Sequence, residues 1–243
     1  MHYKMKTFSH NTFVANRGLN DVPHYYEITV VLEGRFVYFI DDKEFIVSAG
    51  DAIFVRQGQK RHRLPSDESI NYYSINFFCM TDEIPDLPTI IKGSVTRELK
   101  RLFQLTEISF KDYLNEFREE TLYHYICLII MQLKNNLIKN SMNPYIATMI
   151  KYISEHITEK IGLEDVADSV NLSVSHCCYL FKKEMNTTIY DVIMKERIYL
   201  AQNYILSGGF NLKQISSICG FCDYSHFLKS FKKVTGMLPS EYK

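Results

Sequence analysis

A nine-residue motif occurs twice in the C-terminal part of this chain. Residues 175–183 read SHCCYLFKK and residues 225–233 read SHFLKSFKK, so both copies begin with Ser-His and end in Phe-Lys-Lys. The shared phenylalanine suits the buried face of a helix, and each lysine pair lies near a helix end, where it can contact phosphate. The four variable residues fall where the helix can face a DNA groove. A common scaffold with different contact residues is what two recognition helices for different base sequences require.

Each copy follows a short helix and a tight turn. In the first copy, an apolar helix is predicted over residues 163–170, and Ser173 can cap the helix that carries the motif. In the second copy, Gly220 supplies the turn after residues 212–218, and Asp223 is the cap. A helix, a short turn and a second helix form a helix-turn-helix unit. The sequence therefore predicts two such units.

A long helix, predicted over residues 188–206, separates the two units. At 1.5 Å per residue it rises about 28 Å, which is close to the roughly 34 Å between successive major-groove faces of B-DNA. One chain can therefore place two recognition helices in adjacent groove segments. Lys+Arg and Asp+Glu both number 28, so contact with DNA has to come from the local arrangement of charge rather than from a basic domain.

The N-terminal part of the chain predicts strands. Residues 24–80 contain several short alternating or β-branched runs, separated by Glu-Gly, Asp-Asp-Lys and Ala-Gly-Asp turns. Such spacing is typical of a small β-barrel or sandwich. From Ser94 the apolar period becomes helical, and Asn143 and Pro144 then provide the cap and first turn of a new domain. The predicted fold class is α+β with two domains, a β-barrel with a helical hairpin and an all-α domain with two helix-turn-helix units.

An apolar stripe runs along the helix predicted within residues 111–140. The stripe either packs on the barrel or forms a dimer interface, and one face could serve both purposes. Its residues are Leu122, Ile126, Ile129, Ile130, Leu133 and Leu137.

The sequence contains no run apolar enough to span a membrane. The longest such run, residues 125–131, is far shorter than the roughly 18–20 residues that a spanning helix needs. The N-terminus lacks the apolar core of a signal peptide. We therefore expect a cytoplasmic protein whose six cysteines are thiols. Cys219 and Cys222 have C-x-x-C spacing, but a redox or zinc site is not expected without a second pair.

Residues 145–243 closely resemble the DNA-binding domain of the AraC/XylS family of bacterial transcription regulators. The similarity is carried by ISSICGFCDYSHFLKSFKKVTGMLPSEYK at the end of the chain and by Arg-Ile-x-x-Ala at residues 197–201. The lysine pairs of both motifs, Lys182, Lys183, Lys232 and Lys233, are the expected phosphate contacts. The resemblance implies that the base-reading positions are Ser175, Cys178, Tyr179, Tyr224, Ser225, His226 and Lys229.

The first motif departs from the family pattern. Tyr179 stands where the family usually has Arg, and Val174 stands where Pro is common. Because Arg and Asn make the bidentate contacts that discriminate bases best, we expect weaker or more shape-dependent recognition from this half. Arg197 is expected to brace the long helix rather than to contact DNA.

The strands of residues 24–64 look like the sugar-binding, cupin-like domain found in many members of that family. The shared features are His-x-Tyr-Glu, a Gly turn, Ala-Gly-Asp and a late His. The predicted lining of an effector pocket is His24, Tyr26, Glu27, Arg35, Tyr38, Arg56 and His62. Metal-binding cupins offer an alternative, because His24, Glu27 and His62 would make a facial triad. We expect no metal and no cofactor.

Together these features predict a ligand-responsive transcription regulator rather than an enzyme. The expected partners are double-stranded DNA, a small-molecule effector of the sugar type, RNA polymerase and a second copy of the chain, and activation is the expected outcome. The alternatives are a metal-dependent cupin enzyme with a helical appendage and a regulator without an effector. The predicted domains are residues 1–92 for effector sensing, 93–140 for dimerisation, 141–147 as the linker and 148–243 for DNA binding.

Overall fold

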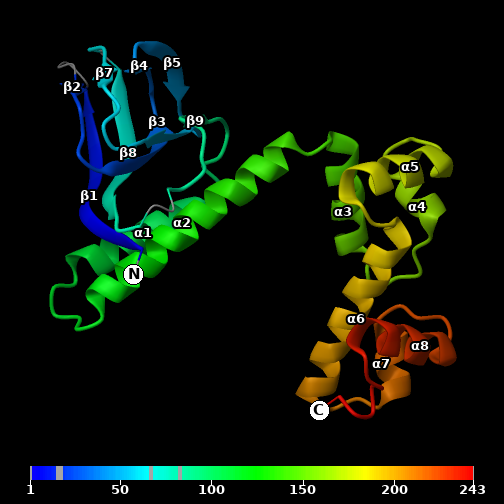
Figure 1. The fold of residues 1–243 in the computed structure, drawn as a ribbon. Coiled ribbons are helices and arrows are strands. Elements are labelled where there is room, and N and C mark those ends of the chain that lie inside the picture. Colours follow the sequence, from blue (N-terminus) through cyan, green and yellow to red (C-terminus); the bar gives the residue numbers. More distant parts are fainter. Residues whose placement is uncertain (1, 15–18, 66–67, 82–83, 243) are drawn as a thin grey trace. The chain divides into compact units, whose positions relative to one another are not determined.

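The computed structural model of the chain describes residues 2–14, 19–65, 68–81 and 84–242. The chain divides between Ser141 and Met142 into two compact units, which we call unit 1 and unit 2 (Figure 1). The helical segment of residues 93–140 belongs to unit 1, together with the strands.

Unit 1 contains two antiparallel sheets and two helices. The five-stranded sheet has the order β1-β8-β3-β6-β9, and the four-stranded sheet has the order β2-β7-β4-β5. Helices α1 and α2 pack side by side on the five-stranded sheet (Figure 1). The elements are β1 (Tyr3–Val14), β2 (Leu19–Asp21), β3 (Tyr26–Glu33), β4 (Arg35–Ile40), β5 (Lys43–Ser48), β6 (Ala52–Val55), β7 (Arg61–Arg63), β8 (Ser69–Cys79), β9 (Ile90–Ile91), α1 (Arg97–Lys111) and α2 (Arg118–Ser141).

Strand β3 is buried on both faces, and its alternation separates two cores. Tyr26, Ile28 and Val30 belong to the core that the five-stranded sheet shares with α1 and α2. Val31 belongs to the core between the two sheets, and Glu27 and Thr29 line a cavity there. Successive side chains of a strand point to opposite faces, so adjacent residues of β3 have different surroundings.

The apolar stripe of α2 forms part of the core of unit 1. Leu122, Ile126, Ile129, Ile130 and Leu133 are buried, and all but Leu122 are grouped with the core beneath the sheet, where Leu137 packs partly buried. Of the two interpretations of this stripe, packing on the barrel is the one that the structure shows. The stripe as a dimer interface is not supported, because its side chains already contact the sheet. The exposed apolar residues of α2 are Leu128, Met131 and Ile138.

Over the described residues 142–242, unit 2 contains six helices. They are α3 (Pro144–Glu155), α4 (Leu163–Asp168), α5 (Val174–Met185), α6 (Ile189–Ser207), α7 (Leu212–Ile218) and α8 (Tyr224–Thr235). Asn143 caps α3, with Pro144 in its first turn, as the sequence predicts. Ala167 of α4 and Ser216 of α7, small residues in the first helix of each helix-turn-helix unit, are both buried.

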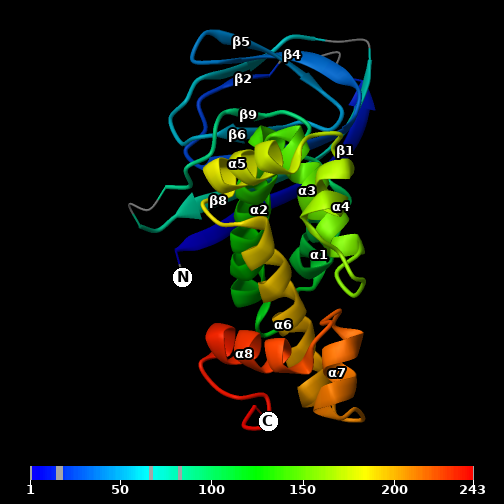
Figure 2. The ribbon, with the colours of Figure 1, turned by 90° about the vertical axis from the view of Figure 1, so that its right-hand side faces the viewer.

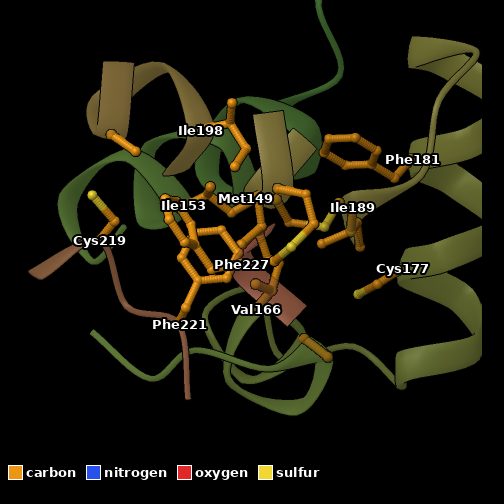
Figure 3. Packing of buried hydrophobic residues seen from close by; sticks show 14 of the residues in the cluster. Met149, Ile153, Val166, Cys177, Phe181, Ile189, Ile198, Cys219, Phe221 and Phe227 are labelled. Atoms are coloured by element: carbon orange, nitrogen blue, oxygen red, sulfur yellow. The ribbon is translucent and has the colours of Figure 1, made fainter. Parts of the chain in front are cut away.

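A single core joins all six helices of unit 2. It includes Met149 and Ile153 from α3, Phe181 from α5, Ile198 from α6 and Phe227 from α8, among eighteen buried residues (Figure 3). The phenylalanines that the repeated motif shares, Phe181 and Phe231, are both fully buried in it. Helices α5 and α8 lie on the same side of α6 and apart from each other (Figures 1 and 2).

Candidate nucleic-acid interface and barrel cavity

Side-chain caps fix where the two recognition helices begin. The Ser173 hydroxyl accepts a hydrogen bond from the backbone N–H of His176 at 3.3 Å, at the start of α5. The Asp223 carboxylate accepts from the N–H groups of Ser225 and His226 at 3.1 and 3.0 Å, at the start of α8. These bonds satisfy N–H groups that a helix leaves without partners at its first turn. Each motif therefore begins at a defined residue on its helix.

The outer face of α5 carries most of its predicted contact residues. Ser175, Tyr179, Lys182 and Lys183 are exposed, and Tyr179 keeps 64% of its surface. Cys178 differs, because it is half-buried and packs against the core of unit 2. His176, which the sequence interpretation did not include, is exposed on this helix. The repeated motif itself contained the signal for it, since His176 occupies the same place as His226.

Only some of the contact residues predicted on α8 are exposed. Ser225, Lys229, Lys232 and Lys233 are exposed. Tyr224 packs partly on the core, with its ring centroid 6.0 Å from that of Phe227.

The imidazole of His226 on α8 is held from inside the protein. Its Nε2 lies 2.8 Å from the Tyr190 hydroxyl of α6 and 3.3 Å from the Ser230 hydroxyl. One edge of the ring is therefore engaged with α6 and α8 rather than free for a base.

Arg197 of α6 ties together segments of the two helix-turn-helix units. Its guanidinium donates to the carbonyls of Ile157 and Glu159, at 3.1 and 2.6 Å, in the loop before α4. The same group lies 5.9 Å from the ring centroid of Phe221, in the turn before α8. Burial lowers the pKa of Arg197 from its ordinary value. Its contacts are those of the brace that the sequence predicts.

The C-x-x-C cysteines occupy different surroundings. Cys219 is fully buried, and burial raises the pKa of its thiol to about 11, whereas Cys222 is exposed. All six cysteines are free thiols. Over the described ranges 2–14, 19–65, 68–81 and 84–242, no cluster of three or more His, Cys, Asp or Glu side chains is arranged to hold a metal ion.

Unit 1 contains a cavity of about 210 Å³ between its two sheets. Its polar lining includes Ser9, Glu27, Thr29, Arg61, Arg63, Ser74 and Asn76, and its apolar and aromatic lining includes Leu19, Phe36, Tyr38, Ile53 and Tyr72. The Thr29 hydroxyl donates to Glu27 Oε1 at 2.8 Å and lies 2.8 Å from the Ser74 hydroxyl. The interior of the barrel is therefore polar, small and rich in hydroxyl groups.

Arg61 is the charged centre of this cavity. It pairs with Glu27 and with Asp21, and its Nη2 donates to Asp21 Oδ2 at 2.9 Å and to the Tyr25 hydroxyl at 3.1 Å. Burial alone would lower the pKa of Arg61, but the hydrogen bond to Asp21 and the charge of Glu27 outweigh it, so the pKa is raised. Burial, followed by the charge of Glu27, raises the pKa of Tyr38 as well.

Only two of the seven residues predicted for the effector pocket line this cavity, namely Glu27 and Tyr38. Tyr26 faces the other core and stacks on Phe54 and Phe77, so its prediction was wrong. The guanidinium of Arg56 donates to the carbonyl of Leu87 at 2.6 Å. His24 and Arg35 are exposed, and neither they nor Arg56 line the cavity.

His62 is likewise outside the cavity. Its ring lies 5.9 Å from that of Phe39, and it lines a separate shallow pocket with Asn20 and Lys60. His24, Glu27 and His62 are therefore not brought together as a facial triad. Glu27 is instead engaged by Arg61 and Thr29.

Two family models match the chain, and they fall in different units. A helix-turn-helix domain matches residues 166–243, and a cupin domain matches residues 21–76. The helix-turn-helix match is of the AraC type. The AraC-type match corresponds to the paired helix-turn-helix units of unit 2, and the cupin match corresponds to strands of unit 1. Lys243, the last residue of the C-terminal match, lies outside the described residues.

The relatives of this chain fall into two groups by coverage. The xylose operon regulatory protein of Haemophilus influenzae is 33% identical over 101 residues, which are 42% of this chain and 26% of that protein. This chain therefore spans about a quarter of the length of that relative. The HTH-type transcriptional regulator YdeC of Bacillus subtilis is 24% identical over 246 residues, covering 89% of this chain and 83% of YdeC.

Among solved structures, the C-terminal domain of AraT, a response regulator from Geobacillus stearothermophilus, is similar to part of this chain. It is 25% identical with a TM-score of 0.41, and the match covers 42% of this chain and 85% of that domain.

Among the described residues, no helix is both long enough and apolar enough to cross a bilayer.

Proposed function

We propose that this chain is a transcription regulator that binds double-stranded DNA through α5 and α8 and responds to a small molecule held in the barrel of unit 1. The observation that carries the proposal is the arrangement of unit 2. Two capped recognition helices lie on one side of α6, share one core, and expose lysine pairs in their last turns (Figure 2).

In this proposal the exposed residues of the two helices have different roles on the duplex. Lys182, Lys183, Lys232 and Lys233 neutralise phosphates and position the protein, without reading sequence. Ser225 and Lys229 on α8 contact base edges, as hydroxyl and ammonium groups can donate to groove acceptors. Ser175 and Tyr179 on α5 contribute weaker or shape-dependent recognition, because neither makes a bidentate pair with a base.

The proposed effector is a small polar molecule of the sugar type. The cavity of about 210 Å³ limits its size, and the hydroxyl groups of Ser9, Thr29 and Ser74 offer both donors and acceptors. Asn76 donates to the Thr7 hydroxyl at 2.8 Å, but among the described residues its buried Oδ1 has no hydrogen-bond partner. A ligand hydroxyl that donates to this oxygen would remove the cost of leaving it unsatisfied.

The proposal extends to a homodimer and to activation through contact with RNA polymerase. A dimer contact on α2 would use the exposed side chains Leu128 and Met131, which lie along a groove that also includes Leu102. Sedimentation velocity with Met131→Lys tests this part. A monomer in the variant and a dimer in the parent are the expected outcomes, and identical sedimentation would remove α2 from the interface.

Selection of bound fragments from genomic DNA tests the main proposal. We expect a recurrent sequence with two contact segments about one helical turn apart, and a shift in affinity or in expression when a matching metabolite is added. A matched variant, Thr29→Val, should lose the ligand response and keep DNA binding in its absence. Binding to random DNA equal to that of every genomic fragment would refute the DNA-binding function. A constant affinity and a constant thermal midpoint across a broad metabolite panel would refute the sensor function alone.

A further inference from the structure

A second pocket lies in unit 2, beside the recognition helix α8. It has a volume of about 400 Å³ and lies between the first two turns of α6 and the outer face of α8. From α6 it is lined by Tyr190, Asp191, Met194 and Lys195, and from α8 by His226, Lys229, Ser230, Lys233 and Val234. This pocket is nearly twice the volume of the barrel cavity.

Three lysines meet at this pocket. Lys195 projects from α6, and Lys229 and Lys233 lie one turn apart on α8. All three are exposed, and within the described part of the chain none of them forms an ion pair. Like charges that share one pocket repel one another, and a bound anion offsets this repulsion because it attracts all three ammonium groups.

Among the described residues, the one acidic residue that lines the pocket, Asp191, forms no ion pair with the lysines. The Asp191 carboxylate instead accepts a hydrogen bond from the Thr188 hydroxyl at 2.7 Å, at the start of α6. The hydrogen bond between Tyr190 and His226 closes the side of the pocket where the two helices meet. Buried Met194 supplies part of its floor. The pocket is therefore a formed site with a cationic rim.

Its place in the fold indicates which anion it takes. Helices α5 and α8 lie on one side of α6 and apart from each other, so a duplex that meets both recognition helices passes over α6 between them (Figures 1 and 2). The part of the duplex between two successive major-groove segments presents its phosphate strands and the minor groove. The cationic rim lies at that level, where α6 meets α8.

We infer that this pocket binds the DNA backbone where it crosses between the two major-groove segments, with Lys195, Lys229 and Lys233 around a phosphate. The inference rests on the proposed DNA-binding function and adds α6 to the DNA contacts. Lys195 is the diagnostic residue, because it lies on neither recognition helix. Lys229 contributes to both base contact and backbone contact, and Lys233 acts on the backbone.

The salt dependence of binding to the selected fragment gives the first test. Lys195→Gln should reduce the slope of log K against log salt by about 0.9 and weaken binding roughly fivefold, equally on preferred and other fragments. The matched control is Lys151→Gln, since Lys151 is an exposed lysine of α3 that does not line the pocket. It makes the same change of charge. Equal slopes for the two variants would overturn the inference.

A duplex with uncharged methylphosphonates between the two contact segments provides the second test. The parent protein should lose several-fold in affinity on this duplex, and Lys195→Gln should lose little more, because the variant and the duplex remove the same interaction. Additive losses would overturn the inference. Unchanged thermal unfolding of Lys195→Gln excludes misfolding as the cause. If the parent shows no preference for any fragment, the proposed function fails instead, and the two failures are distinguishable.

Discussion

The guanidinium of Arg197 lies directly against Gly220, so that a Cβ added to Gly220 would stand 3.0 Å from Arg197 Nη2. The same Cβ would stand 3.0 Å from the carbonyl oxygen of Glu159, which accepts a hydrogen bond from Arg197. Gly220 also has a φ of +77°, which side chains other than glycine rarely adopt. The turn of the second helix-turn-helix unit is thereby packed against the loop that precedes the first.

Replacing Gly220 should therefore lower the free energy of unfolding by more than replacing another glycine with a positive φ. Gly236→Ala serves as the matched control, since Gly236 has a φ of +83° and open space around its Cα. We expect Gly236→Ala to lower the free energy of unfolding by about 1 kcal/mol from backbone strain alone. Gly220→Ala should lose roughly 2 kcal/mol more, because Arg197 and the Glu159 carbonyl have to move. Urea unfolding of unit 2 measures both, and equal losses would contradict the crowding.

Removing one partner of the ion pairs inside the barrel should strongly reduce the stability of unit 1. Arg61→Gln leaves the buried carboxylate of Glu27 without its cation, and we expect a loss of about 3–5 kcal/mol in the stability of unit 1. The double variant Arg61→Gln/Glu27→Gln should regain part of that loss. Lys60→Gln removes an exposed partner of Asp42 and should cost less than about 1 kcal/mol. Thermal unfolding monitored by circular dichroism separates these outcomes, and a loss for Arg61→Gln no larger than for Lys60→Gln would contradict this account.

The cysteines of the C-x-x-C segment should react at very different rates. Alkylation requires the thiolate, and burial holds the Cys219 pKa at about 11, above its ordinary value, so almost all of this thiol is protonated at neutral pH. Iodoacetamide should modify the exposed Cys222 in the folded protein and leave Cys219 intact, as read by peptide mass spectrometry. In denaturant all six cysteines should react. Rapid labelling of Cys219 in the folded state would contradict its buried position.

Residues that read bases and residues that bind phosphate should differ in the pattern of their losses. Ser225→Ala should change the preference at one or a few base pairs by about 1 kcal/mol and leave the salt slope unchanged. Lys232→Ala should weaken binding to every fragment and reduce the slope by about 0.9. Ser217→Ala on α7 is the control for Ser225, because it removes an exposed hydroxyl outside the recognition helix. Competition with single-substituted fragments measures all three, and a uniform loss from Ser225→Ala would make it a positioning residue.

The helices of unit 2 were predictable because their ends are encoded locally. Asn143, Ser173 and Asp223 cap the helices that the sequence assigned to them, and the helices predicted over residues 163–170, 188–206 and 212–218 agree with the structure to within two residues at each end. The buried faces followed from the helical period, which places Phe181 and Phe231 toward one core. The hydrogen bond of His226 to Tyr190 was not predictable, because these residues are 36 positions apart and belong to different helices.

The barrel cavity was less predictable, for a physical reason. Alternation in a strand separates two faces but does not say which face meets the other sheet when both faces are buried. The sequence does not show that helices cover one face of β3, so Tyr26 and Glu27 were both predicted as pocket residues. In the structure Tyr26 lies on the face that the helices cover, and only Glu27 lines the cavity. Arg61 has no distinguishing neighbour in sequence, since its partners Asp21 and Glu27 come from β2 and β3. Strand β1 also escaped prediction.

The shared core of unit 2 has a consequence for the DNA that this chain can use. One core holds side chains of both recognition helices, including Phe181 and Phe227, together with Met149 and Ile198 (Figure 3). Neither recognition helix can therefore shift without disturbing the other. One extra base pair between the two contact segments would rotate the second segment by about 35° around the duplex axis. We therefore expect operators for this protein to tolerate base substitutions far better than insertions between the two contact segments, so that related operators differ in sequence and keep the same length.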